Sequence, residues 1–267
     1  MMSATGRAIL LAALTMLAAA PALAARRRDA PPDTTGRFVT HEIKHRGVRH
    51  RYAVWLPPGW TRERTWPGVV FLHGSGESGA DGLAPTRVGL GPALARDPAR
   101  WPCVVVFPQK PSEEHEWEEH EGLVMKVLHD ADWRYPMSRR VALTGISQGG
   151  HGVWVFGARS PERWSCLAPV CGYGRWRTVA RRVAGLPVWA FHGLRDDLVD
   201  PEDTRQIVGA IQAERARRGR VPDGPEGARM TLYAEANHNA WDPAYAEPDL
   251  PGWLIAPPDW ERRVPDR

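Results

Sequence analysis

The sequence predicts an α/β protein with three layers, in which helices cover both faces of a mostly parallel central sheet. Three observations support this. Short apolar runs alternate with helix-like segments along the chain, a Gly-x-Ser-x-Gly motif directly follows one apolar run, and acidic and histidine residues follow two later runs. Such alternation is typical of parallel strands joined by helices that cross over the sheet.

The chain begins with a segment typical of a secretory signal peptide. Residues 1–24 contain Arg7, then an apolar run over 8–20, then Ala22-Leu23-Ala24. A charged start, a short apolar stretch and a small-x-small cleavage site predict export, and the run is too short to span a membrane. We therefore expect a bacterial protein with a Sec-type signal, secreted or periplasmic, that is not inserted in the membrane after cleavage.

The remaining composition predicts one folded domain. Residues 25–37, rich in Arg, Pro, Asp, Thr and Gly, predict a disordered N-terminal segment, and residues 38–267 are enough for one domain with a full core. The formal net charge of +4 is a weak excess, and no block of bases occurs beyond Arg26-Arg27-Arg28, which argues against nucleic-acid binding. Apolar neighbours predict buried thiols, with no disulfide, for Cys103, Cys166 and Cys171. We expect a monomer or a weak homodimer.

The expected elements follow one another as strands and helices should in such a sheet. Strands are expected near 38–45, 48–56, 67–72, 102–107, 140–145, 166–171, 187–192 and 229–234, and helices near 86–96, 118–131, 148–159, 176–184 and 201–218. Only about 15 residues separate the strand at 166–171 from the strand at 187–192, which is too few for an inserted lid domain. We therefore expect an open, water-accessible site.

Ser147 is the candidate nucleophile. It is the central residue of Gly145-Ile146-Ser147-Gln148-Gly149, between the apolar run 141–144 and a helix-like segment. A strand that turns at once into a helix through this motif is typical of a nucleophile elbow, in which the serine stands on a strained turn. The neighbours two positions on either side must then be almost free of side chain, and both are glycine.

A nucleophilic serine needs a base, and the base needs an acid that orients it. Asp196 follows the apolar strand at 187–192, and His238 follows the last expected strand. Both therefore stand at the carboxyl edge of the sheet, in the order serine, acid, histidine. Asp197 is the nearest alternative acid, whereas Asp200 precedes a proline and is expected to cap a helix.

The other histidines have structural interpretations. His73 and His192 each precede a glycine at a strand end, where we expect them to brace loops, and His151 is expected to pack on the helix after the serine. His115 and His120 are five residues apart, whereas two zinc ligands on one helix are four apart. The sequence therefore predicts neither a metal ion nor an organic cofactor.

Acyl transfer also needs hydrogen-bond donors for the developing oxyanion. The backbone N–H of Gln148, directly after the nucleophile, is the first candidate. The second comes from the glycine-rich loop after the strand at 67–72, where the N–H of Ser75 is preferred and that of Gly74 is the alternative. A phosphate-binding loop is excluded because neither of its glycine motifs is present.

These motifs resemble one known group of proteins. The stretches Leu72–Glu77, Thr144–Trp154, Ala168–Gly172, Phe191–Val199 and His238–Tyr245 are similar to the secreted esterases grouped with polyhydroxybutyrate depolymerases and feruloyl esterases. That group lies beside the dienelactone hydrolase-like branch of the α/β-hydrolase superfamily. The resemblance covers roughly residues 50 to 255. It implies a three-layer α/β-hydrolase fold and, in the acid loop, an aspartate three residues after His-Gly, which is Asp196.

The sequence therefore predicts a serine esterase that cleaves short-chain, aromatic or sugar-linked carboxylic esters through an acyl-enzyme. The alternatives are a serine peptidase of the same fold and a binding protein that kept the fold without activity. The chain has 13 tryptophans. Among these, Trp117, Trp176 and Trp241 belong to segments near the carboxyl edge of the sheet, and one or two of them are expected to line an acyl pocket.

Overall fold

The computed structural model describes residues 35–256. The predicted signal peptide at 1–24 and most of the expected N-terminal segment at 25–37 lie outside the described residues. Within 35–256, no helix is both long enough and apolar enough to cross a membrane.

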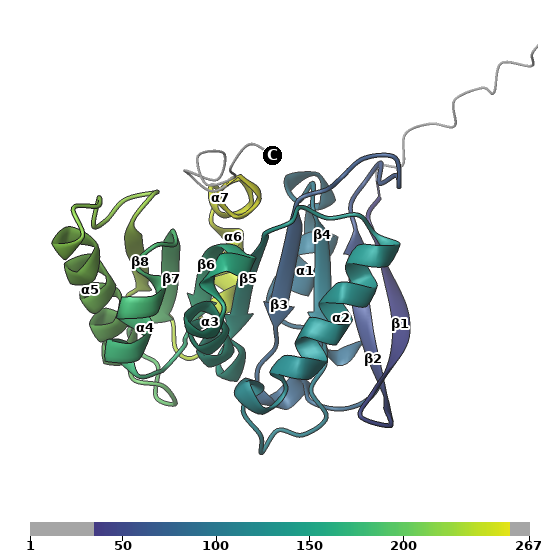
Figure 1. Ribbon diagram of the computed structural model, residues 1–267. Coiled ribbons are helices and arrows are strands. Elements are labelled where there is room, and N and C mark those ends of the chain that lie inside the picture. Colours follow the sequence, from purple (N-terminus) through teal and green to yellow (C-terminus); the bar gives the residue numbers. More distant parts are fainter. Residues whose placement is uncertain (1–34, 257–267) are drawn as a thin grey trace, which may run out of the picture. The chain divides into compact units, whose positions relative to one another are not determined.

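Eight strands form one sheet in the order β1-β2-β4-β3-β5-β6-β7-β8 (Figure 1). Their bounds are β1 Arg37–His45, β2 Val48–Leu56, β3 Gly68–Leu72, β4 Val104–Pro108, β5 Val141–Ile146, β6 Trp164–Val170, β7 Val188–Gly193 and β8 Ala228–Tyr233. β2 pairs antiparallel with both β1 and β4, and all pairs from β4 to β8 are parallel. The expected mostly parallel sheet is confirmed.

Helices cover both faces of this sheet. The helices are α1 Leu90–Arg96, α2 Glu121–Arg134, α3 Gln148–Arg159, α4 Trp176–Val183, α5 Pro201–Arg217, α6 Trp241–Ala246 and α7 Leu250–Ile255. Buried residues of α2, α3, α4 and α5 belong to one apolar core, and those of α1, α6 and α7 belong to a second one. The sheet therefore separates two cores, as in the expected three-layer arrangement (Figure 1).

The strands supply both cores by turning alternate side chains to opposite faces. In β3, Val70 and Leu72 enter the first core and Val69 and Phe71 enter the second. All five residues of β3 are buried. This explains why its sequence is a continuous apolar run rather than an alternating one.

The helix predictions differ from the structure in two places. The helix expected near 86–96 begins only at Leu90, because Gly89 has a φ of +62° that interrupts it after a short 3-10 turn. Helices α6 and α7 were not predicted. Each has six residues including a proline, so neither shows a periodic apolar pattern. Between β6 and β7, helix α4 is the only helix or strand, so no lid domain is inserted there.

The turn from β5 into α3 is packed against its neighbours through glycines. A Cβ on Gly149 would stand 1.9 Å from the carbonyl oxygen of Leu72, and a Cβ on Gly145 would stand 2.7 Å from the same oxygen. A Cβ on Gly150 would stand 2.5 Å from the carbonyl oxygen of Val170. Helix α3 can therefore lie against β3 and β6 only because these positions carry no side chain.

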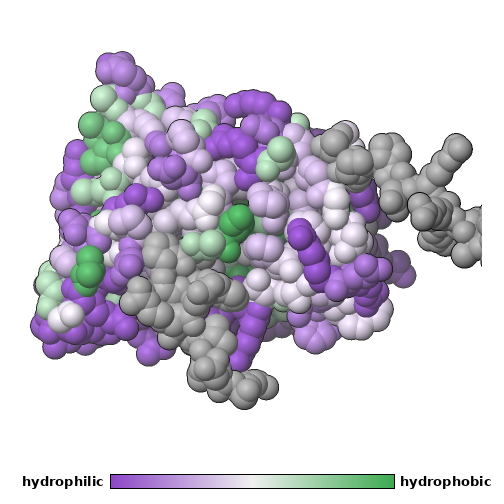
Figure 2. Space-filling model, turned by 90° about the horizontal axis from the view of Figure 1, so that it is seen from above, coloured by the Kyte–Doolittle hydropathy of each residue, from purple (hydrophilic) through white to green (hydrophobic). Residues whose placement is uncertain are grey.

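The surface seen from above in Figure 2 is mainly hydrophilic. Apolar residues of the described chain form only small, separate spots on the visible part of this face. Single exposed apolar residues are normal for a folded domain, whereas a large continuous patch marks an interface. This face therefore offers no argument for an obligate partner.

Substituting Gly149 by alanine is expected to lower the free energy of unfolding by about 3 kcal/mol, the upper end of the usual range, because the added methyl group meets backbone atoms rather than a flexible side chain. Urea unfolding followed by circular dichroism measures the effect. Gly209→Ala is the matched control, since open space surrounds this glycine of α5. There, alanine should stabilise the helix by up to about 1 kcal/mol. Equal effects of both substitutions would contradict this account of the turn.

Candidate active site

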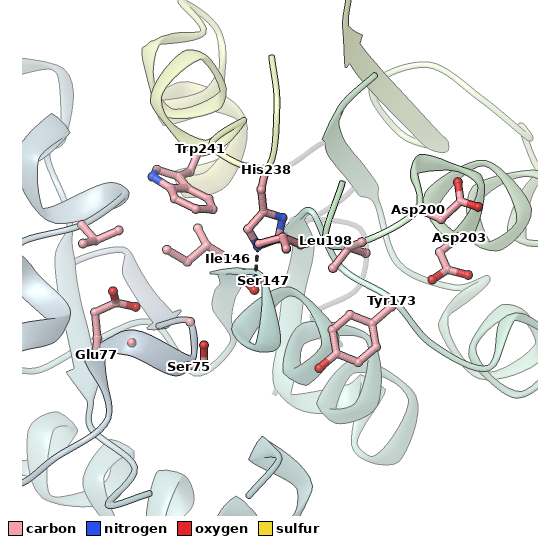
Figure 3. A pocket seen from close by; sticks show the side chains of 14 residues that line it. Ser75, Glu77, Ile146, Ser147, Tyr173, Leu198, Asp200, Asp203, His238 and Trp241 are labelled. Carbon is pink, nitrogen blue, oxygen red and sulfur yellow. Dashed lines mark hydrogen bonds between the residues drawn. The ribbon is translucent and has the colours of Figure 1, made fainter. Parts of the chain in front are cut away.

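Ser147 is the single residue between the end of β5 and the start of α3, and its backbone conformation is strained. Its φ is +54° and its ψ is −120°, in a region that residues with a side chain seldom adopt. The conformation is held from both sides. The Ser147 N–H donates to the Val170 carbonyl at 3.0 Å, and the Ser147 carbonyl accepts from the His151 N–H at 3.0 Å. This turn lifts the hydroxyl above the end of the sheet, where it lines a cavity (Figure 3).

His238 reaches the serine from the loop between β8 and α6. Its Nε2 lies 2.9 Å from the Ser147 hydroxyl, and its Nδ1 lies 2.8 Å from Oδ2 of Asp196. The structure thus brings Ser147, His238 and Asp196 together, although they are far apart in the sequence. The alternative acid, Asp197, is exposed. Asp200 caps α5, as expected, by accepting the Glu202 N–H at 2.8 Å.

The carboxylate of Asp196 is fully buried but is saturated with hydrogen bonds. Oδ1 accepts the N–H groups of Leu198 and Val199, each at 3.0 Å. Oδ2 is shared by His238 at 2.8 Å and His192 at 3.1 Å. Burial alone would raise the pKa of this carboxyl group, but the bonds from Val199, His238 and Leu198 outweigh it and hold the pKa below its usual range. Asp196 therefore stays ionised while it holds the His238 ring.

His192 braces Asp196 rather than only its own loop. Its Nε2 faces Asp196 and also the Val199 carbonyl, at 3.1 Å each, and both partners can only accept. Nε2 must therefore carry a proton. Because burial lowers the pKa of His192, the ring carries no second proton and is neutral. Nδ1 then accepts the hydroxyl of Thr204 at 2.8 Å. The sequence interpretation had no signal for Thr204, because helix α5 carries it to this point.

Cys171 lies beside these residues, just after β6. Among the described residues, Cys171, Asp196 and His238 are the only group whose three possible metal-ligand atoms lie within 4.8 Å of one another. The three cysteines are free and buried, as expected. Burial raises the pKa of the Cys171 thiol to about 12, and the thiol donates to the His238 carbonyl at 3.2 Å. A neutral thiol is a poor metal ligand, so this group fits a hydrogen-bonded cluster better than a metal centre.

The loop after β3 is held in place by His73, which is fully buried. The Lys110 N–H donates to Nε2 of His73 at 3.1 Å, so the ring proton is on Nδ1, which donates to the Gly74 carbonyl at 2.5 Å. Burial lowers the pKa of His73 from 6.5 to about 3. The ring therefore acts as a neutral brace for the segment that contains Ser75, in agreement with its expected loop-bracing role.

Glu77 is a cavity residue that the sequence did not single out. It follows Ser75 in the 3-10 turn η1 Ser75–Glu77. Burial raises the pKa of its carboxyl group and outweighs the nearby backbone N–H groups of Gly74 and Glu77, which lower it. A Cβ on Gly74 would stand 3.2 Å from the Glu77 carboxylate and 3.5 Å from Cβ of Ser147. A side chain at position 74 would therefore press on the Glu77 carboxylate and make ordinary van der Waals contact with Ser147.

The cavity around Ser147 has a volume of about 530 Å³ and is open to solvent. Figure 3 shows Ser75 and Glu77 on one side of the serine, and Tyr173, Asp200 and Asp203 on the other. The full lining is Gly74, Ser75, Gly76, Glu77, Val88, Ile146, Ser147, Tyr173, Leu198, Val199, Asp200, Asp203, His238 and Trp241. No lysine or arginine is among these residues, so the charges around the cavity are carboxylates.

Of the three tryptophans expected at the site, only Trp241 lines the cavity. Its ring meets the His238 ring edge-on, with 5.4 Å between centroids. The prediction for Trp117 is wrong. This residue is fully buried and packs against α3 where Gly152 leaves room, and its Nε1 donates to the His73 carbonyl at 3.0 Å. The prediction for Trp176 is also wrong, because it lies in a separate hollow between α4 and α5.

His151 packs on α3, as expected, and supports the cavity wall. Its ring stacks on Tyr173 with 4.6 Å between centroids, and its Nδ1 lies 2.9 Å from the Tyr173 carbonyl. Its Nε2 lies 2.7 Å from the carboxylate of Glu118. The His151 ring therefore positions Tyr173, whereas only the backbone N–H of His151 contacts Ser147.

The comparisons with known proteins agree with this architecture. No protein-family model and no curated protein match the sequence. Among solved structures, a thermostable esterase is 26% identical with a TM-score of 0.70, and the match covers 82% of this chain and 63% of that one. The chain thus spans less than two thirds of the length of that esterase.

Two other solved structures are more distant. The feruloyl esterase module from Clostridium thermocellum, complexed with sinapinate, is 14% identical with a TM-score of 0.65, over 84% of this chain and 90% of that one. The acylaminoacyl peptidase of Pyrococcus horikoshii is 12% identical with a TM-score of 0.62, over 87% of this chain and 42% of that one.

This chain has an α/β-hydrolase fold. The order of its strands and the similarity to solved esterases both support this, and the expectation from the sequence is confirmed. In this α/β-hydrolase fold, Ser147, Asp196 and His238 each follow a parallel strand, so all three stand at the carboxyl edge of the sheet.

The low pKa of His73 predicts a pH-dependent stability. The unfolded chain takes up a proton on this ring near pH 6.5, but the folded chain does so only near pH 3. Between these values the unfolded state binds more protons, so stability falls as the pH is lowered, by up to about 1.4 kcal/mol per pH unit. Urea unfolding at several pH values should show a flatter slope for His73→Gln. The exposed His129→Gln on α2 should keep the wild-type slope, and an unchanged slope in His73→Gln would contradict the assignment.

Proposed function

We propose that this protein is a serine esterase that hydrolyses carboxylic esters through an acyl-enzyme intermediate. The observation that carries the proposal is the pair of hydrogen bonds that joins the Ser147 hydroxyl to His238 at 2.9 Å and His238 to Asp196 at 2.8 Å. A hydroxyl becomes a useful nucleophile when an adjacent base accepts its proton and a third group orients that base.

The roles of the three residues follow from their contacts. The Ser147 Oγ attacks the ester carbonyl carbon while Nε2 of His238 accepts its proton. The same proton then passes to the departing alcohol, and water repeats the cycle to release the acid. Asp196 holds Nδ1–H of His238 and stabilises the imidazolium, and it remains ionised because its own bonds keep its pKa low.

Two backbone N–H groups are proposed as donors to the oxyanion. Gln148 is the first residue of α3, next to the nucleophile, so its N–H faces outward from the helix start. In the loop after β3, Ser75 is the first residue of the 3-10 turn, so its N–H has no partner within that turn. This supports the Ser75 N–H as the second donor, with the Gly74 N–H as the alternative.

The cavity supports a neutral ester substrate of modest size. Carboxylates of Glu77, Asp200 and Asp203 surround it without a lysine or arginine, so an anionic acyl chain would be repelled. Trp241 offers an aromatic surface next to His238. Short-chain, aromatic and sugar-linked esters all suit an open cavity with these walls. A secreted or periplasmic location, after removal of residues 1–24, remains part of the proposal.

The decisive experiment compares the wild type with Ser147→Ala on p-nitrophenyl esters from acetate to octanoate. Loss of the nucleophile is expected to lower turnover by at least about 10⁴-fold, because the three residues act as a unit. The matched control is Ser160→Ala, at the other end of α3, which should keep wild-type turnover. The chain-length profile of the wild type also measures the acyl pocket.

The same proteins separate the proposal from its alternatives. A fluorophosphonate should label the wild type and Ser160→Ala but not Ser147→Ala, whereas a protein that only binds ligands would not be labelled at all. Esters and amides of the same acyl group should then be compared. Faster cleavage of the amide would favour the peptidase alternative and overturn the assignment as an esterase.

Trp241→Ala is expected to raise KM for aryl esters about three- to tenfold while kcat changes less, because the ring offers binding surface but no proton transfer. Steady-state kinetics with p-nitrophenyl acetate and a feruloyl ester test this. Trp176→Ala is the control, since this tryptophan lies outside the cavity, and it should leave KM unchanged. A rise in KM in both variants would point to a general loss of stability.

A further inference from the structure

A second hollow, of about 300 Å³, is lined by four histidines. His45 and His50 stand on either side of the turn between β1 and β2, and His115 and His120 come from the segment between β4 and α2. Glu119 adds a carboxylate to the same wall. We call this hollow the histidine pocket. None of its residues lines the cavity of Ser147.

The imidazole rings have spacings that suit a shared ion. The rings of His45 and His50 lie 6.2 Å apart between centroids, and those of His115 and His120 lie 6.0 Å apart. With a Zn–N bond of about 2.1 Å, a ring centroid stands about 3 Å from the ion, so two rings at the tetrahedral angle lie about 5 Å apart. Each pair must therefore close by about 1 Å to share one ion.

A buried nitrogen of His120 supplies an independent argument for a bound ion. Its Nε2 is buried, and within the described chain it has no hydrogen-bond partner. A buried ring nitrogen without a partner costs free energy and calls for an explanation, one of which is an absent ion. His120 also stands at the N-terminal end of α2, at the junction between the segment after β4 and the helix.

The chemistry of these side chains suits a cation. A neutral imidazole ring offers a lone pair to a metal ion. The carboxylate of Glu119, 3.7 Å from the His115 ring, supplies negative charge beside them.

We propose that the histidine pocket binds one zinc ion through His45, His50 and His120, with His115 or Glu119 as the fourth ligand. Imidazole nitrogens are typical ligands of zinc, and four ligands complete its tetrahedral shell. The sequence spacing of His115 and His120 argued against a site on one helix. The structure instead adds two ligands from the β1–β2 hairpin, more than sixty residues earlier in the chain.

The rings must turn inward to reach the ion, because the cluster around Asp196 is the only one within residues 35–256 that already gathers three ligand atoms within 4.8 Å. The outer ligands are free to do so. The side chains of His115 and Glu119 are 53% and 55% exposed. The ion would then tie the edge hairpin of the sheet to the start of α2, so binding should also raise the melting temperature.

The test is a calorimetric titration of Zn²⁺ into the protein without a polyhistidine tag, with Ca²⁺ in parallel. One Zn²⁺ per chain is expected to bind, and Ca²⁺, which prefers oxygen ligands, is not. His50→Ala and His120→Ala should each weaken zinc binding at least about tenfold. His129→Ala, an exposed histidine of α2 outside the pocket, should bind zinc like the wild type. His50→Gln keeps a similar size if the alanine variant does not fold.

Two further measurements locate the ion. Zn²⁺ should raise the melting temperature of the wild type but not that of the His50→Gln, His120→Gln double variant. Asp196→Asn should keep wild-type zinc affinity, because the proposed site does not include the cluster around Ser147. Absence of binding by the wild type, wild-type affinity in the His50 and His120 variants, or loss of binding in Asp196→Asn would each overturn the proposal. None of these results depends on ester hydrolysis.

Discussion

The strained turn at Ser147 is the constraint on which the rest of the site depends. Strand β5 must end and helix α3 must begin at a single residue, whose φ is +54°. Such a backbone persists only when its surroundings leave no alternative. Here the helix lies so close to β3 that Gly149 has no room for a Cβ. The same packing that strains the turn therefore holds it, and it directs the Ser147 hydroxyl into the cavity.

The site also requires a carboxylate that stays ionised although it is buried. A carboxylate loses its hydration when it is buried, and without partners it would take up a proton. Asp196 avoids this because four donors reach its two oxygens, two from its own loop and two from histidine rings. The neutral His192, held by Thr204, is one of these donors. The ring of His238 is thus oriented by a network that extends beyond the three catalytic candidates.

The segment between β4 and α2 connects the cavity of Ser147 with the histidine pocket. Its Glu113 carbonyl accepts the side chain of Gln148 at 3.0 Å, and its Glu116 carboxylate accepts the Tyr173 hydroxyl at 2.6 Å. The same segment carries His115 and His120 into the histidine pocket. An ion that ordered this segment would therefore act on residues that border the cavity, with no direct contact to Ser147.

Local pattern was enough to predict the parallel sheet and the meeting of Ser147, Asp196 and His238, because the fold requires residues at the ends of neighbouring strands to share one edge. Pattern could not decide which side chains face the cavity. Trp117 is buried where Gly152 leaves room for it, and Glu77 turns toward the serine through a 3-10 turn. Such outcomes depend on contacts between segments distant in the chain, and only the packed tertiary structure determines them.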